Sequence, residues 1–208
     1  MPLRVEYKNH IGQGLHLWHI SESEQFFKDH TDISDRKWQE VSQWKAGRRR
    51  EWLAGRFLIH RYASCTSKDL IIDDFGKPQI PHNGEISISH SGDYASIYLD
   101  NAPCGVDIQM RKPAITKLRH KYCTDADLET FNEYDVMDAL HLVWCSKEAV
   151  YKAYGQKEVD YKRHIRIFRD GARLSATMIK DNISLKYELH SRVINNLYLV
   201  ICRQILRE

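Results

Sequence analysis

The feature that most constrains the fold is residues 137–154, a segment whose apolar side chains recur at helical spacing. This stripe predicts an amphipathic helix, and the glycine that follows it is a residue that commonly ends one. The stripe consists of Leu140, Val143, Trp144, Val150, Tyr151 and Tyr154. Strand-like segments precede the helix, and residues 165–203 after it are mostly strand-like. The chain is therefore predicted to be an α+β protein.

Shorter segments complete this pattern. Alternating or β-branched stretches predict strands at residues 15–20, 70–72, 85–90, 94–99 and 105–110. Helical spacing predicts a helix over residues 34–63, interrupted at Gly47, and further helices at residues 114–122 and 125–133. No internal repeat or flexible linker separates the chain, and the pattern divides near Pro103. We expect two lobes of similar size, residues 1–103 and 104–208.

Composition excludes several classes of protein. The chain has 208 residues and a net charge of +3, and its pI of 8.5 lies below the value of about 9 that is typical of nucleic-acid-binding domains. Five scattered cysteines without a Cys-x-x-Cys pair argue against a disulfide framework or a zinc site. The longest apolar run is about a third of the roughly 20 residues that a membrane helix needs. Charged residues within the first ten argue against a signal peptide, so we expect a cytoplasmic protein without membrane association.

The helix at residues 137–154 contains charges that break its own pattern. Lys147 falls within the apolar stripe, and Glu148 and Lys152 lie four residues apart at its border. Glu148 and Lys152 alone fit an ordinary ion pair on a helix surface. An ammonium group on a core-facing stripe is costly unless it meets an anion or reaches water along its own stem. Lys147 therefore makes a functional site here plausible.

Three other polar residues are ordinary when each is taken alone. Asp107 lies between Val106 and Ile108 in an apolar strand, where it fits either a metal ligand or the cap of a loop. His90 ends an apolar strand, as many hydrogen-bonded structural histidines do. Lys77 lies in a Gly-Lys-Pro turn, where a solvated lysine is common.

Taken together and in this order, these segments closely resemble the motifs of the Sfp-type 4'-phosphopantetheinyl transferases. The four segments are residues 75–78 (FGKP), 86–91 (ISISHS), 105–108 (GVDI) and 144–152 (WCSKEAVYK). The resemblance implies two pseudo-symmetric α+β lobes, each a small antiparallel sheet packed with helices, and a ligand cleft between them. It also implies an enzyme that works as a monomer.

The family moves the phosphopantetheine arm of coenzyme A to a serine of an acyl or peptidyl carrier protein and releases adenosine 3',5'-bisphosphate. Such phosphoryl chemistry depends on neutralising and positioning a highly charged pyrophosphate, for which Mg²⁺ takes carboxylate and phosphate oxygens. By the resemblance, Asp107 and Glu148 hold the Mg²⁺ ion. Glu148 is also the candidate base for the serine proton, and Lys152 faces the phosphates.

The resemblance assigns further residues to coenzyme A. His90 is expected to contact a phosphate as part of the catalytic set, and Ser89 to help hold the nucleotide. Gly76 and Lys77 form the turn that approaches the nucleotide end, and Lys147 is expected to point toward the same cleft. Guanidinium groups suit the 3'-phosphate, and in the basic segment at residues 34–63 the candidates are Arg49 and Arg56.

Two residues depart from the family pattern. Many members carry a second acidic residue two places after the aspartate, where this chain has Gln109. Either Gln109 offers a neutral oxygen to the metal or a water molecule fills the position, so a site with three carboxylates is not expected. Ser87 stands where many members have asparagine, which is a local exchange of hydrogen-bonding groups.

Two other functions compete with the transferase. A nucleic-acid-binding module would use the basic helix and bind in a strongly salt-dependent way, but it leaves Asp107 and Glu148 unexplained. A coenzyme A-binding protein without catalytic activity would explain Gln109. The transferase is preferred because it accounts for all four segments, and it implies coenzyme A and an apo carrier protein as partners, without nucleic acid or membrane.

Overall fold

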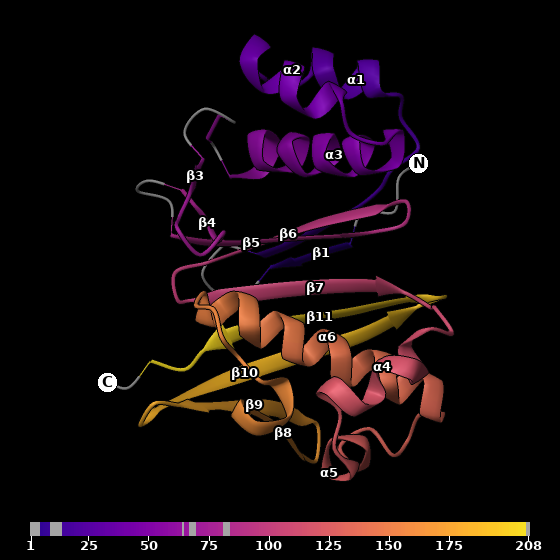
Figure 1. The fold of residues 1–208 in the computed structure, drawn as a ribbon, viewed down its shortest axis with the longest axis vertical. Coiled ribbons are helices and arrows are strands. Elements are labelled where there is room, and N and C mark those ends of the chain that lie inside the picture. Colours follow the sequence, from indigo (N-terminus) through magenta and orange to yellow (C-terminus); the bar gives the residue numbers. More distant parts are fainter. Residues whose placement is uncertain (1–4, 9–13, 64, 67–69, 81–83, 207–208) are drawn as a thin grey trace. The chain divides into compact units, whose positions relative to one another are not determined.

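The computed structural model describes residues 5–8, 14–63, 65–66, 70–80 and 84–206. The chain divides into two compact units, residues 1–101 and 102–208 (Figure 1). The predicted division, after residue 103, lies two residues further along the chain. Both units combine antiparallel strands with helices, which confirms the predicted α+β class.

The first unit contains an antiparallel sheet in the order β1-β2-β6-β5-β4-β3. Its longest strands, β5 and β6, are joined by a tight turn in which Gly92 has a positive φ of 59°. The predicted strands at residues 15–20, 70–72, 85–90 and 94–99 are confirmed within a residue or two, whereas β1 and β4 were not predicted. The strands are β1 (Val5–Lys8), β2 (Gly14–His19), β3 (Ile71–Ile72), β4 (Pro78–Gln79), β5 (Glu85–Ser91) and β6 (Tyr94–Asp100).

Three helices accompany this sheet: α1 (Glu24–Asp29), α2 (Asp35–Ser42) and α3 (Ala46–Tyr62). Ser34 begins α2 as predicted, because its hydroxyl accepts the backbone N–H of Lys37. The chain leaves the helix at residues 43–45 rather than at Gly47, which lies inside α3. One face of α3 packs against β5 and β6, and the core between them includes Leu53, Phe57, Leu58, Ile86 and Ile97.

The second unit has a five-stranded antiparallel sheet in the order β7-β11-β10-β9-β8. Strand β7 follows directly after the first unit. It forms one edge of the sheet and pairs with the last strand, β11. The predicted strand at residues 105–110 and the strand-rich segment at residues 165–203 are thereby confirmed. The strands are β7 (Cys104–Met110), β8 (Ile165–Asp170), β9 (Arg173–Lys180), β10 (Ile183–Ile194) and β11 (Leu197–Gln204).

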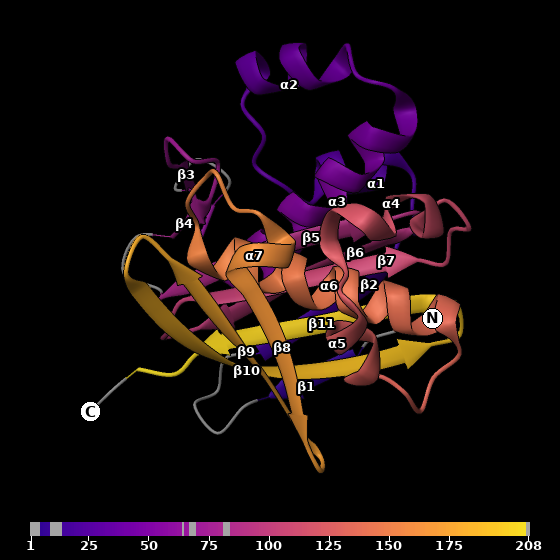
Figure 2. The same cartoon turned by 60° about the horizontal axis from the view of Figure 1, so that its bottom comes forward.

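The predicted amphipathic helix is α6 (Val136–Tyr154), which lies along one face of this sheet (Figure 2). It packs chiefly against β7 and β11 and buries Leu140, Val143 and Val150. As predicted, it ends at Gly155, whose φ of 72° is the left-handed conformation that glycine adopts without strain. The other helices are α4 (Ile115–Tyr122), α5 (Asp125–Glu129) and α7 (Tyr161–His164); α5 is shorter than predicted, and α7 was not predicted.

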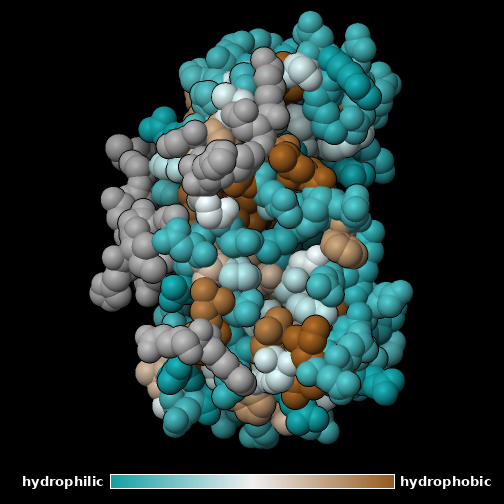
Figure 3. Space-filling view, turned by 90° about the vertical axis from the view of Figure 1, so that its left-hand side faces the viewer, coloured by the Kyte–Doolittle hydropathy of each residue, from teal (hydrophilic) through white to brown (hydrophobic). Residues whose placement is uncertain are grey.

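The surface is mostly polar where Figure 3 shows it, with hydrophobic side chains in small separate groups. Exposed large hydrophobic residues include Ile71, Ile72 and Phe75 in the first unit and Phe168 in the second. Among the described residues, the helices are all too short or too polar to cross a bilayer.

Candidate active site

The candidate catalytic residues of the second unit lie where β7 and α6 touch. A methyl group in place of the Gly105 hydrogen would lie 1.9 Å from the backbone oxygen of Ala149 and 2.7 Å from its carbonyl carbon. Only glycine therefore allows the strand and the helix to approach this closely. The approach brings Asp107, two residues further along β7, next to the part of α6 that carries Glu148 and Lys152.

A hydrogen-bonded cluster ties the start of α6 to the end of β7. Arg111 donates to the carboxylate of Asp138 and, over 2.8 Å, to the hydroxyl of Tyr198. The ring of His141 stacks on Tyr198, and its Nε2 accepts the backbone N–H of Lys112 over 3.0 Å. Close packing at Gly105 and this cluster together fix the alignment of the strand with the helix.

Asp107 and Lys152 form a direct ion pair. The Lys152 Nζ lies 2.7 Å from the Asp107 Oδ1 and also donates to the carbonyl oxygen of Val106 over 2.9 Å. The Asp107 side chain is almost buried, whereas 27% of the Lys152 side chain is exposed. The pair therefore has one side open to a ligand, and Glu148 lies one helical turn before Lys152.

Burial and neighbouring charges shift the pKa of Glu148. Burial raises the pKa of Glu148, and the nearby Asp107 carboxylate raises it further. The charge of Lys152 and a hydrogen bond from Tyr161 oppose this rise. The Tyr161 hydroxyl donates to the Glu148 Oε1 over 2.8 Å. Two carboxylates that repel each other in a largely buried site favour the binding of a cation or a proton between them.

Lys147 does not belong to this group, and its predicted contact with coenzyme A is wrong. Its side chain is fully buried, and its Nζ lies 2.7 Å from the Asp127 Oδ2 and 2.9 Å from the backbone oxygen of Tyr161. Burial lowers the pKa of Lys147, and Asp127 opposes that effect. The expectation that this ammonium meets an anion is correct, but the anion belongs to α5 and not to a ligand.

Gln109, the third predicted metal ligand, lies two residues after Asp107 on β7, so both side chains are on one face of the strand. Its amide nitrogen donates to the backbone oxygen of Met110 over 3.4 Å. Within the described ranges, His, Cys, Asp and Glu side chains form no group of three or more that could hold a metal ion. The oxygen donors available here are two carboxylates and one amide.

Lys77 and Gly76 lie in the first unit, in the turn between β3 and β4. The Asp73 carboxylate accepts the backbone N–H groups of Phe75 and Lys77, and Gly76 has a positive φ of 91°. The Lys77 Nζ lies 2.6 Å from the Glu85 Oε2. Lys77 is thus engaged with the neighbouring strand instead of extending into solvent.

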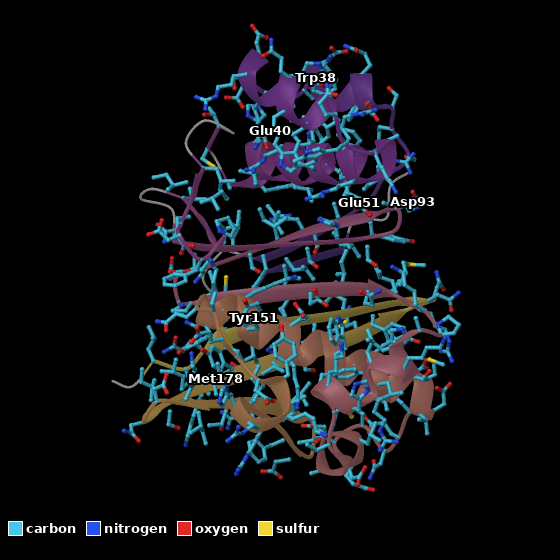
Figure 4. All side chains as sticks on the ribbon, viewed as in Figure 1. Trp38, Glu40, Glu51, Asp93, Tyr151 and Met178 are labelled. Carbon is cyan, nitrogen blue, oxygen red and sulfur yellow. The ribbon has the colours of Figure 1, made fainter. Side chains whose placement is uncertain are left out.

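Ser89 and His90 are consecutive residues of β5, so their side chains lie on opposite faces of the sheet. Ser89 is buried, and half of the His90 side chain is exposed. The His90 Nδ1 lies 3.2 Å from the Glu51 Oε2 on α3, near Asp93 in the turn after β5 (Figure 4). The structure therefore places Ser89 and His90 on different faces of the sheet, and their expected contacts with coenzyme A stay predictions.

The two candidate arginines differ sharply. The Arg49 guanidinium lies 2.7 Å from the Glu24 Oε2 and donates to the backbone oxygens of Ser42 and Trp44, so it joins α1, α2 and α3. The Arg56 guanidinium lies over the ring of Trp52, and its buried Nη1 has no hydrogen-bond partner among the described residues. Burial lowers the pKa of Arg56.

Arg56 also lines a pocket of about 250 Å³ in the first unit, together with Lys37, Ser34 and Trp52. Asp32 also lines the pocket, and the Lys37 Nζ lies 2.8 Å from the Glu40 Oε2, so the Arg56 guanidinium is the group there that best suits an anion. The structure thus separates the two candidates, because Arg49 has a structural role and Arg56 has a donor left to use.

Three residues of the second unit were not singled out from the sequence. Asp127 is marked by the spacing Thr124-x-x-Asp127, which begins α5 as a capping box and could have been recognised. Gly105 was seen only as part of a motif, since the contact with Ala149 is between segments far apart in the chain. Tyr161 carries no sequence signal, because nothing local indicates that it reaches Glu148.

Comparison with known proteins finds similarity to one family. Residues 103–202 match the model of the 4'-phosphopantetheinyl transferase superfamily. The chain is 28% identical to 4'-phosphopantetheinyl transferase AcpT of Salmonella typhimurium over 116 residues, 52% of this chain and 60% of that protein. It is 28% identical to 4'-phosphopantetheinyl transferase Sfp of Bacillus subtilis over 108 residues, 49% of this chain and 48% of that protein.

The second unit, which carries Asp107 and Glu148, thus falls almost entirely within the matched region. Residues 103–202 are thus similar to the 4'-phosphopantetheinyl transferase superfamily, which agrees with the resemblance seen in the ordered motifs. The chain spans about half the length of the curated relatives that it matches.

Proposed function

We propose that this protein transfers the 4'-phosphopantetheine group of coenzyme A to a serine hydroxyl of an apo carrier protein, with adenosine 3',5'-bisphosphate as the second product. The observation that carries the proposal is the cluster of Asp107, Lys152 and Glu148 at the contact of β7 and α6. Its two carboxylates can bind a divalent cation, and its ammonium group can bind the phosphates that the cation also contacts. The named relatives support the same reaction class.

The donor set fits Mg²⁺. Asp107 and Glu148 supply hard carboxylate oxygens, and Gln109 presents an amide oxygen on the same face of β7 as Asp107. Mg²⁺ commonly takes one or two carboxylates and fills its other positions with phosphate oxygens and water. When bound, the ion would neutralise charge on the pyrophosphate of coenzyme A.

The residues around the ion then have separate tasks. Glu148 accepts the proton of the carrier serine, directly or through a water molecule, and burial suits it to this task by raising its pKa toward neutrality. The serine oxygen forms a bond to the phosphorus that carries the pantetheine arm, and the bond from that phosphorus to the bridging oxygen breaks. Lys152 supplies positive charge for the oxygen that departs with adenosine 3',5'-bisphosphate.

In the first unit, Arg56 is the residue that we propose for the 3'-phosphate of coenzyme A. Its unused donor and the pocket shared with Lys37 support this role. His90, half exposed on β5, stays a candidate for a phosphate contact, and Lys77 a candidate for the nucleotide end.

The experiment incubates the protein with coenzyme A, Mg²⁺ and a panel of apo carrier proteins, and reads the intact mass of each carrier. Wild-type protein should convert at least one carrier, and a metal chelator should stop the conversion. Asp107→Asn and Glu148→Gln should fold normally but lose nearly all transfer. Full activity in either variant contradicts the site, and coenzyme A binding without turnover on any carrier favours a binding protein.

A further inference from the structure

Tyr161 touches the candidate base from outside the helix that carries it. Its hydroxyl donates to the Glu148 Oε1 over 2.8 Å, although Tyr161 is the first residue of α7 and Glu148 lies in α6. Its ring packs against those of Trp144 and Tyr151, with centroids 6.0 and 5.7 Å away. The aromatic packing places the ring, so that the hydroxyl meets one particular oxygen of the carboxylate.

The backbone of Tyr161 is held as firmly as its ring. The Lys147 Nζ donates to the Tyr161 carbonyl oxygen over 2.9 Å and to the Asp127 Oδ2 over 2.7 Å. The Asp127 Oδ2 also accepts the backbone N–H and the hydroxyl of Thr124, each over 2.8 Å. On the other side, the Asp160 carboxylate accepts the backbone N–H groups of the two residues after Tyr161.

These contacts form one continuous path from the cap of α5 to the site. The path runs from Thr124 through Asp127 and Lys147 to Tyr161, and it ends on Glu148. Lys147 is buried and apart from the ligand-facing group, yet it is adjacent in sequence to Glu148 and holds the residue that touches it. The buried charge of Lys147 therefore helps to orient Glu148, because it holds the backbone of Tyr161.

We propose that Tyr161 is a positioning residue for the site of the divalent cation, because it orients the Glu148 carboxylate. By donating to Oε1, the hydroxyl fixes the orientation of the Glu148 carboxylate, which would be one of the groups that hold the ion. Groups that hydrogen-bond to a metal ligand typically contribute 10–100-fold to metal affinity or activity. The inference rests on the proposed function, because it requires Glu148 to be a metal ligand.

The test compares Tyr161→Phe with Tyr151→Phe. Both variants lose one phenol hydroxyl from neighbouring rings. Tyr151 lies on α6 (Figure 4), and among the described residues the phenol that donates to Glu148 is that of Tyr161. Electron paramagnetic resonance then measures Mn²⁺ binding in the presence of coenzyme A and in the absence of carrier protein. Tyr161→Phe should bind Mn²⁺ about 10-fold or more weakly, whereas Tyr151→Phe should match the wild type.

Transfer kinetics provide a second readout. Tyr161→Phe should lower kcat at subsaturating Mg²⁺ and recover as Mg²⁺ is raised, with KM for coenzyme A unchanged. Equal Mn²⁺ affinity in the two variants would overturn the inference. The proposed function would still stand in that case if the wild-type protein transfers the group. A Tyr161→Phe protein that no longer folds would assign the hydroxyl a structural role and also overturn it. Wild-type protein without transfer on any carrier would contradict the proposed function itself.

Discussion

Lys147 and Asp127 form a buried ion pair, in which the Lys147 Nζ lies 2.7 Å from the Asp127 Oδ2 and the Asp127 side chain is almost entirely buried. The pair joins α6 to the cap of α5, and the same ammonium binds the backbone at the start of α7. Three helices of the second unit therefore meet at one charge. Such a pair is weak evidence of net stabilisation, but loss of one partner leaves the other charge buried and unpaired.

Lys147→Met should therefore destabilise the second unit strongly. The substitution keeps the length of the side chain but removes the cation from Asp127, and the expected loss in the free energy of unfolding is about 3–5 kcal/mol. Urea denaturation followed by circular dichroism measures it. Lys121→Met, at an exposed lysine of α4, is the control and should stay within about 0.5 kcal/mol of the wild type. Equal effects of the two substitutions would contradict the assigned role of Lys147.

Gly105→Ala tests the close contact of β7 and α6. The added methyl group meets backbone atoms of Ala149, which cannot rotate away as a side chain could, so the helix must shift. We expect a loss of at least about 2 kcal/mol, in the upper part of the range for overpacked cores. We also expect reduced transfer, because Glu148 and Lys152 move with the helix.

Gly47→Ala provides the matched control for this substitution. Gly47 lies in α3, and a methyl group there meets nothing within 4 Å. Alanine favours helix more than glycine does, so this variant should be unchanged or more stable by up to about 1 kcal/mol. The comparison fails if both glycine variants unfold at the same urea concentration.

Arg56→Ala tests the proposed site for the 3'-phosphate. A hydrogen bond to a charged group contributes about 1.5–3 kcal/mol, so KM for coenzyme A should rise about 10-fold or more. With 3'-dephospho-coenzyme A, wild type and variant should have the same KM. Arg49→Ala should instead lower the urea midpoint and leave KM unchanged, since Arg49 holds three helices together. The assignment is wrong if Arg56→Ala raises KM equally for both substrates.

His141 should make stability depend on pH. Burial lowers its pKa in the folded protein below the ordinary value of about 6.5, and its Nε2 already accepts the backbone N–H of Lys112. Well above a pH of about 6.5, the histidine is neutral in both the folded and the unfolded states. As pH falls below that value, the unfolded chain takes up the proton first, so the free energy of unfolding falls.

Urea denaturation at several pH values from about 7.5 to about 5 measures this dependence. This range spans the ordinary pKa of histidine, which is about 6.5. The wild type should lose stability over the lower part of the range, and His141→Gln should lose less. Parallel curves for the two proteins would show that His141 does not contribute.

Much of the fold could be predicted because its signals are local. The apolar spacing of α6 and the glycine after it fixed that helix to within one residue, and alternation of side chains located β5, β6 and β7. The break between α2 and α3 was predicted at Gly47 because glycine often interrupts a helix. In the structure Gly47 lies within α3, and the break falls at residues 43–45. Helix α7 was missed because it has only four residues, too few for a periodic pattern.

The site was predictable only in part, for a related reason. The sequence marked Asp107, Glu148 and Lys152 through motif order, and it correctly required an anion for Lys147. It did not identify Asp127, which lies 20 residues before Lys147 and reaches it through tertiary packing. The same holds for Arg49 and Arg56, since only the folded helices show which guanidinium group is already engaged.

A crystal structure with coenzyme A and Mn²⁺ tests the central claim most directly. Anomalous scattering should locate one Mn²⁺ ion bonded to carboxylate oxygens of both Asp107 and Glu148 and to the pyrophosphate of coenzyme A. An ion held elsewhere, with these two carboxylates directed away from the pyrophosphate, would contradict the account.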